Sequence, residues 1–144
     1  MKIAIGSDHA GYKLKEAIKK YLDKKNIASK DFGTFSAESC DYPDFAFPVA
    51  RAVAAGKFDR GILICGSGVG VTVTANRVKG IRAVNAFNVY TARQSRAHGD
   101  SNVLCLAGKK LPTAAALRIL KVWLTTSFSG EERHLRRINK LDNL

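Results

Sequence analysis

One short segment limits the folds that are open to this chain. Residues 61–64 read Gly-Ile-Leu-Ile, and Cys65 separates them from the run Gly-Ser-Gly-Val-Gly at 66–70. An unbroken run of branched apolar residues is typical of a strand buried on both faces, as in a parallel sheet. Alternating glycines then let the backbone turn sharply and present its N–H groups to a ligand. The segment therefore predicts a buried strand that ends in a binding loop.

Strand and helix patterns alternate along the whole chain. Strands are expected over residues 2–6, 27–32, 60–65, 82–86 and 102–106. Helices are expected over residues 12–25, 45–55, 69–77, 89–97, 112–125 and 131–143. This order predicts an α/β fold: a three-layer, doubly wound, Rossmann-like sheet of five parallel strands, with an extra C-terminal helix. No linker, repeat or low-complexity tract interrupts it, so residues 1–144 are expected to form one domain.

Composition narrows the class of protein. No segment approaches the ~18 uninterrupted apolar residues of a membrane span, and the N-terminus lacks the features of a signal peptide. The three cysteines, at 40, 65 and 105, do not form a disulfide framework and indicate a reducing compartment. Neither a CxxC nor an HExxH pattern occurs, so no metal site is predicted. We expect a cytoplasmic protein without a membrane partner.

The net charge of +12 invites a different interpretation, because a basic chain also fits a nucleic-acid-binding module. The lysines and arginines are spread over the chain, however, and many lie on predicted helix faces. Net charge bears on solubility and association more than on fold. We therefore interpret it as a solvated basic surface and predict no nucleic-acid partner.

Two groups of polar residues follow predicted strands. Asp8 and His9 come after the first strand, where a carboxylate beside an imidazole can orient a sugar hydroxyl and take up its proton. The alternative is that Asp8 is merely the N-cap of the next helix. Cys65 lies where a strand becomes a helix, and the amide donors and helix dipole there favour a thiolate. Its alternatives are a buried structural cysteine or a phosphate-cradling nucleotide loop without chemistry.

Two further groups lie near the C-terminus. His98 ends a predicted helix, where a histidine serves either as a capping group or as a catalyst. Arg133 and Arg137 lie four residues apart on one helix face, which suits either phosphate oxygens or a solvated basic surface. Together with Cys65 and Asp8, they describe a site where a thiol base acts on an anionic substrate.

The chain resembles the ribose-5-phosphate isomerase B family, which includes galactose-6-phosphate isomerase subunits. The matching stretches run through nearly the whole chain and include IGSDHAG at 5–11, DFGT at 31–34, DYPDFA at 41–46, DRGILICGSGVG at 59–70 and RHLRR at 133–137. The resemblance implies an isomerase of the pentose phosphate pathway that interconverts D-ribose 5-phosphate and D-ribulose 5-phosphate through a cis-enediolate, with no metal or organic cofactor.

The resemblance also implies residue roles. Cys65 would move the proton from C2 to C1 of the substrate, Ser67 would help to pass a proton between O1 and O2, and Asp8 and His98 would open the furanose ring. The N–H groups of the loop would hold the oxyanion. The other substrate-binding positions would be His9, Tyr42, Gly66, Gly68, Val69, Gly70, Gly99, Arg133 and Arg137, with His9 and the two arginines on the phosphate.

In the family the pocket lies between subunits, so the resemblance implies a homodimer, or a tetramer built from such dimers. Several positions depart from the family pattern. Ser67 replaces the usual Thr, Gly99 stands where an Asn is common, Phe87-Asn88 replaces a frequent His-Asp, and Lys109 replaces an Arg. The extra room at Gly99 keeps another substrate open, such as allose 6-phosphate, galactose 6-phosphate or a tetrose phosphate.

Overall fold

The computed structural model describes all 144 residues and contains one parallel sheet. Its strands are β1 (Lys2–Ser7), β2 (Ala28–Asp31), β3 (Arg60–Cys65), β4 (Ala83–Asn85) and β5 (Val103–Ala107). They are arranged in the order β2-β1-β3-β5-β4, and every neighbouring pair is parallel. The predicted five-stranded parallel sheet is confirmed.

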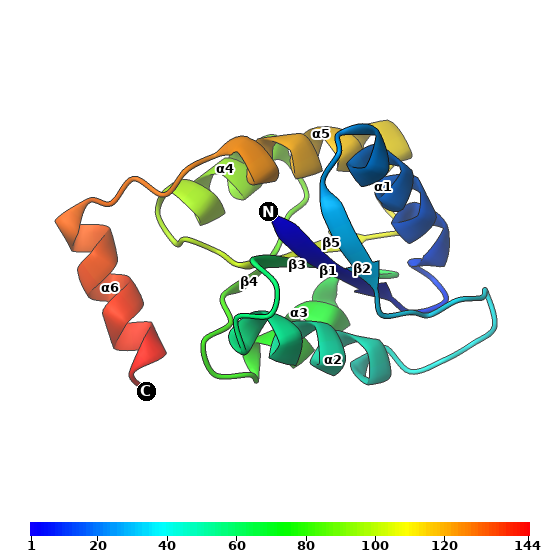
Figure 1. Cartoon of the computed structure of the whole chain (residues 1–144), viewed down its shortest axis with the longest axis horizontal. Coiled ribbons are helices and arrows are strands. Elements are labelled where there is room, and N and C mark those ends of the chain that lie inside the picture. The colour runs from blue at the N-terminus through cyan, green and yellow to red at the C-terminus, as the bar shows by residue number, and fades with distance from the viewer.

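Helices cover both faces of the sheet (Figure 1). They are α1 (Tyr12–Lys24), α2 (Pro43–Ala54), α3 (Val69–Asn76), α4 (Val89–Ala97), α5 (Thr113–Thr125) and α6 (Glu132–Asp142). α1, α4 and α5 lie on one face, and α2 and α3 lie on the other, which confirms the three-layer architecture. None of them is long and apolar enough to cross a membrane.

The two faces of β3 explain its apolar sequence. Ile62 and Ile64 point into the larger core cluster, which contains the apolar residues of α1 and α5. Leu63 and Cys65 point into the second cluster, with those of α2 and α3. Successive side chains of a strand alternate between faces, so a strand covered on both sides must be apolar throughout.

The structure differs from the sequence prediction mainly at the start of α2. This helix begins at Pro43 rather than at Phe45, because the fixed φ of proline suits the first helical turn, where no N–H is needed. The extra C-terminal helix is confirmed. α6 stands apart from the layered body at the end of an extended segment (Figure 1), and His134 and Ile138 are its buried residues.

A buried ion pair joins α1 to β2. The side chain of Lys15 is fully buried, and its Nζ donates to Asp31 Oδ2 at 2.5 Å. Lys19 Nζ donates to the same oxygen at 2.8 Å. Burial raises the pKa of Asp31, but the hydrogen bonds from Lys15 and Lys19 outweigh it and hold that pKa below its usual value of 3.8. The charge of Lys15 is thus matched inside the fold.

Replacing Asp31 by alanine should destabilise the protein by about 3 kcal/mol, because it removes both hydrogen-bonded ion pairs and leaves the buried Lys15 Nζ with only Glu16 Oε1, 3.6 Å away. Urea unfolding at pH 7 measures this loss. The wild-type contribution is complete above the unfolded pKa and is lost as the pH falls through the lower folded pKa, so the two proteins should converge in acid. Glu16→Ala is the matched control, because it removes a half-exposed carboxylate that hydrogen-bonds to Lys19 and lies 3.6 Å from Lys15 Nζ, contacts worth at most about 1 kcal/mol. Equal losses for both variants would contradict this account.

Candidate functional site

The predicted loops meet where the chain changes direction in the sheet. β1 lies between β2 and β3, so the connections after β1 and after β3 run towards opposite edges. Ligands of open α/β sheets bind at the carboxyl ends of the strands at such a switch point. The Asp8 N–H donates to Ile64 O at 3.2 Å, and the Gly108 N–H donates to Cys65 O at 2.8 Å. The segments that follow β1, β3 and β5 are thus joined at the carboxyl ends of the strands, which we call the carboxyl edge of the sheet.

Asp8 is buried at this edge, with 6% of its surface exposed. Its Oδ1 accepts the Gly11 N–H at 3.0 Å. The N-cap residue of α1 is Gly11 and not Asp8, so the N-cap alternative is wrong. The carboxylate lies one turn before the helix, beside the end of β3.

Cys65 is the last residue of β3 and is 4% exposed. The loop that follows is held on one side by the Lys109 N–H, which donates to Gly66 O at 3.1 Å. Gly68 has a φ of +76°, a left-handed conformation that glycine adopts at little cost, and it is the N-cap residue of α3. Ser67 lies exposed between the two glycines, and its Oγ accepts the Val69 N–H at 3.2 Å.

A second buried thiol lies near Cys65 without reaching the loop. Cys105 is on β5, and burial raises its pKa to about 12, an effect that the neighbouring Cys65 increases and a hydrogen bond with Thr72 reduces. Cys105 therefore remains a neutral thiol at physiological pH. All three cysteines are free, and of the two buried ones it is Cys65 that adjoins the glycine loop.

His9 has a defined tautomer. Its Nδ1 accepts the Cys40 N–H at 3.2 Å, so in the neutral ring the proton is on Nε2. The Cys40 thiol is 3.9 Å from the same nitrogen. The Nε2–H of His9 is therefore the donor with which this side chain can meet an anion.

Tyr42 and Asn85 both pack against the glycine loop, and of the two only Tyr42 was predicted from the sequence. A Cβ at Gly70 would lie 2.6 Å from Tyr42 Cζ, so the tyrosine ring is seated directly on the first turn of α3. Asn85, the last residue of β4, donates from Nδ2 to Ser67 O at 3.2 Å, and its buried Oδ1 has no partner. A polar residue at the end of a short strand was the signal available in the sequence.

The remaining predicted site residues lie at the amino ends of the strands, which we call the amino edge of the sheet. His98 and Gly99 follow α4 and precede β5, so they are at the amino ends of the strands. A parallel strand rises about 3.3 Å per residue, so the length of β5 alone separates the two edges by about 16 Å. One chain therefore brings Asp8, His9, Tyr42 and Cys65 together, but not His98.

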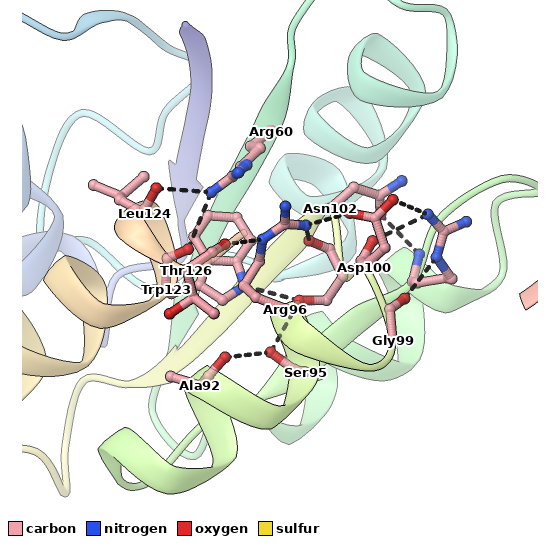
Figure 2. A network of polar contacts seen from close by, with 12 residues as sticks. Arg60, Ala92, Ser95, Arg96, Gly99, Asp100, Asn102, Trp123, Leu124 and Thr126 are labelled. Carbon is pink, nitrogen blue, oxygen red and sulfur yellow. Dashed lines mark hydrogen bonds and ion pairs between the residues drawn. The ribbon is translucent and has the colours of Figure 1, made fainter. Parts of the chain in front are cut away.

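Figure 2 shows the polar network that fixes the turn around Gly99. The buried Arg96 donates from Nη1 to Asp100 Oδ1 at 2.8 Å and to Ser101 O at 2.6 Å, and from Nε to Thr126 O at 3.3 Å. Arg82 donates from Nε to Gly99 O at 3.0 Å. The turn is thus held by two guanidinium groups.

Arg60 extends this network towards α5. It donates from Nη1 to Trp123 O at 3.0 Å, as Figure 2 also shows. Burial, with a smaller effect of Arg96, lowers the pKa of Arg60 to about 10. The guanidinium remains charged at physiological pH, so the end of α5 is fixed to the same edge of the sheet.

α6 carries Arg133 and Arg137 at this same amino edge. The Ser129 N–H donates to Ala97 O at 2.9 Å, and Arg82 Nη1 donates to both carboxylate oxygens of Asp142 at 2.8 and 2.9 Å. Both arginines are exposed, and Arg133 Nε pairs with Glu131 at 3.0 Å.

His134, on the same helix, was not predicted as a site residue. Its ring stacks on that of His98, with centroids 4.1 Å apart. Burial, the neighbouring His98, Arg133 and Arg137 lower the pKa of His134, and Glu131 opposes them. A histidine between two arginines was the signal in the sequence, but nothing there showed which side of α6 would be buried.

Chemically, the carboxyl edge offers a thiol, a carboxylate, an imidazole N–H and a loop of amide donors. No cluster of three or more His, Cys, Asp or Glu side chains is placed to hold a metal ion. This set of groups is suited to moving protons on a polar substrate and to stabilising a developing oxyanion.

Comparisons with known proteins agree on one family. The Ribose/Galactose Isomerase family model matches residues 3–141. Ribose-5-phosphate isomerase B of Escherichia coli is 43% identical over 140 residues, which cover 97% of this chain and 93% of the relative. D-erythrulose-4-phosphate isomerase 2 of Mycolicibacterium smegmatis is 37% identical over 98% of this chain and 95% of the relative. The structure of Clostridium thermocellum ribose-5-phosphate isomerase B superposes with a TM-score of 0.97 at 48% identity, over 99% of this chain and 96% of that one.

The packing of Gly68 against Asn85 gives a test of the loop. A Cβ at Gly68 would lie 2.3 Å from Asn85 Oδ1, whereas Gly80, with a φ of +87°, has open space around it. Both alanine substitutions should lose about 1 kcal/mol from the left-handed backbone. Gly68→Ala should lose about 1–3 kcal/mol more from overpacking in urea unfolding, and adding Asn85→Ala should remove that excess. Equal losses at Gly68 and Gly80 would contradict the packing described here.

Proposed function

The chain belongs to the Ribose/Galactose Isomerase family, and from this premise we propose that it interconverts D-ribose 5-phosphate and D-ribulose 5-phosphate. The observation that carries the proposal is the position of Cys65 at the β1/β3 switch point, beside the glycine loop and the buried Asp8. We treat residues 1–144 as one isomerase domain. The reaction belongs to the pentose phosphate pathway.

Cys65 is the base in this proposal. It takes the proton from C2 of the open-chain sugar and returns it to C1, so no bond forms to sulfur and no oxidant is needed. The intermediate is a cis-enediolate whose oxyanion lies against N–H groups of the loop over residues 66–70. Each such donor is worth about 3–4 kcal/mol in comparable oxyanion holes. Ser67 is exposed in this loop and passes the hydroxyl proton between O1 and O2.

Ring opening and phosphate binding use the remaining groups. Asp8 and His98 exchange protons with the ring oxygen and the anomeric hydroxyl. His9 Nε2–H, Arg133 and Arg137 bind the phosphate, and the arginine forks match its oxygens. Tyr42, seated on Gly70, forms a wall of the pocket. No cofactor enters the scheme, because deprotonation and reprotonation of neighbouring carbons balance without one.

Two copies of the chain are needed to complete this site. Within one chain His98, Gly99 and the two arginines are at the amino edge, and Cys65 is at the carboxyl edge. A two-fold dimer brings the amino edge of one copy to the carboxyl edge of the other and forms two identical sites. Exposed apolar side chains at both edges support this contact: Val69, Val73, Phe87, Tyr90, Leu135 and Leu141. We propose a homodimer, alone or paired into a tetramer.

A second candidate is the same reaction on another sugar phosphate. The 37% identity to a D-erythrulose-4-phosphate isomerase favours a tetrose phosphate. Gly99, which has no side chain to fill the pocket, also leaves room for allose or galactose 6-phosphate. Comparing kcat/KM over four-, five- and six-carbon sugar phosphates decides between them, and a preference other than ribose 5-phosphate overturns the first assignment.

We place the reaction in the cytoplasm. A thiol base works only while it is reduced, and all three cysteines of the chain are free. A reducing compartment preserves them.

Cys65→Ala should lower kcat for ribose 5-phosphate by about 10²–10⁴-fold, the usual contribution of a general base. A coupled assay of ribulose 5-phosphate formation measures this. Cys40→Ala is the control, because that half-exposed thiol has no part in the proton transfer, and alanine keeps the backbone N–H that donates to His9, so kcat should change little. An active Cys65→Ala protein with an unchanged fold would exclude Cys65 as the base.

Mixing two inactive variants tests the shared site. When Cys65→Ala and His98→Ala chains are unfolded together and refolded, half of the dimers are mixed, and each mixed dimer holds one intact site. The mixture should therefore recover about one quarter of wild-type activity.

Cys65→Ala mixed with Asp8→Ala is the matched control. Both changes lie at the carboxyl edge, so each site of that mixed dimer lacks one of the two groups and no activity should return. Recovery in both mixtures, or in neither, would contradict a site divided between the two edges in this way.

A further inference from the structure

His134 is a buried polar residue on an otherwise exposed, charged helix. It is 5% exposed, and its Nε2 is buried without a hydrogen-bond partner. Buried polar atoms in folded proteins are nearly always paired, so an exception calls for an explanation. A purely structural contact at this position of α6 would be met by an apolar side chain, such as that of Ile138 one turn later.

The contact that buries His134 is a stack on His98. The ring centroids are 4.1 Å apart and the ring planes are within 13° of parallel. At this distance, rotation of the His98 ring about its Cβ–Cγ bond would drive its edge into the face of His134. The exposed ring of His98 is therefore restricted to one plane, although it has no side-chain hydrogen bond to hold it.

The two elements that carry the rings are themselves fixed. The Ser129 N–H donates to Ala97 O at 2.9 Å, next to His98. Arg82 joins Gly99 O to the carboxylate of Asp142, at the far end of α6. The stack lies between these two connections, so it joins the turn at His98 to the helix that carries Arg133 and Arg137.

Charged and titratable groups surround the buried ring of His134. The groups that face His134 are His98 just after α4, Arg133 and Arg137 on α6, and Glu131 just before α6. Burial and the cations disfavour a proton on His134 and Glu131 favours one, and the balance lowers its pKa. The surroundings of the buried ring thus favour its neutral form.

We propose that His134 is a positioning residue, which through its stacked imidazole holds the His98 ring in the plane required for ring opening and keeps it in register with the two phosphate-binding arginines. This inference rests on the proposed function, because it takes His98 as the group that opens the sugar ring. It assigns no contact between His134 and the substrate.

Two substitutions separate positioning from space filling. His134→Phe keeps a flat ring that stacks, and His134→Leu fills a similar volume without one. Small misplacements of a reacting group lower turnover by up to about 10²-fold, so His134→Leu should lower kcat by about 10- to 100-fold with KM nearly unchanged. His134→Phe should keep most of the wild-type kcat. Lys121→Ala, on the solvent side of α5, controls for general effects of substitution.

NMR of the histidine rings supplies a readout that does not depend on turnover. The chain has three histidines, and the His98 signal is identified by its loss in His98→Asn. The ring current of a stacked partner should shift the His98 ring protons upfield in the wild type and in His134→Phe, and that shift should vanish in His134→Leu.

The outcomes are distinct. If His134→Leu and His134→Phe have the same kcat, the positioning role is overturned, while the Cys65→Ala result still stands for the proposed function. If the His98 shift is the same in all three proteins, the stack does not hold the ring, and the proposal is again overturned. A wild-type protein inactive on every sugar phosphate overturns the proposed function, and the positioning role with it.

Discussion

The pairing of β1 with β3 is the contact on which the rest of the site depends. These neighbouring parallel strands place Asp8 and Cys65 at the same edge, and the hydrogen bond from the Asp8 N–H to Ile64 O joins the two turns. Both strands are buried on both faces, so neither can shift without opening one of the two core clusters. The position of the thiol is thus set by the core of the sheet and not by a flexible loop.

The amino edge is held together by other contacts. Polar contacts hold much of it: Arg96 and Arg82 bind backbone carbonyl groups of the turn before β5, and Arg82 also pairs with Asp142 of α6. Guanidinium groups suit this task because their donors are arranged in a rigid fork. The result is a fixed surface that presents His98 and two arginines away from the Cys65 of the same chain. This division is the physical reason for proposing a shared site.

Much of the fold was predictable from the sequence because its evidence is local. The apolar run Gly61–Ile64 favours a strand buried on both faces, and the glycines after Cys65 favour a turn. The carboxyl-edge residues followed from the same reasoning, since Asp8 and Cys65 each come directly after a strand. The start of α2 was two residues off, because Pro43 begins a helix as readily as it ends a loop.

The features that were missed depend on contacts distant in the sequence. Nothing local shows that Asn85 reaches Ser67, or that His134 faces His98 while Arg133 faces solvent. The buried side of α6 is set by packing across 36 residues of chain, from His98 to His134. The placement of His98 far from Cys65 follows from strand direction, because a residue between a helix and the next parallel strand lies at the amino ends of the strands.

A crystal structure with ribulose 5-phosphate bound tests the central claim most directly, namely that each site is formed by the opposite edges of two chains. It should show one sugar phosphate between two copies, with C1 and C2 at the Cys65 thiol of one copy and the phosphate on Arg133 and Arg137 of the other. A sugar phosphate held entirely by one chain, or bound away from Cys65, would contradict it.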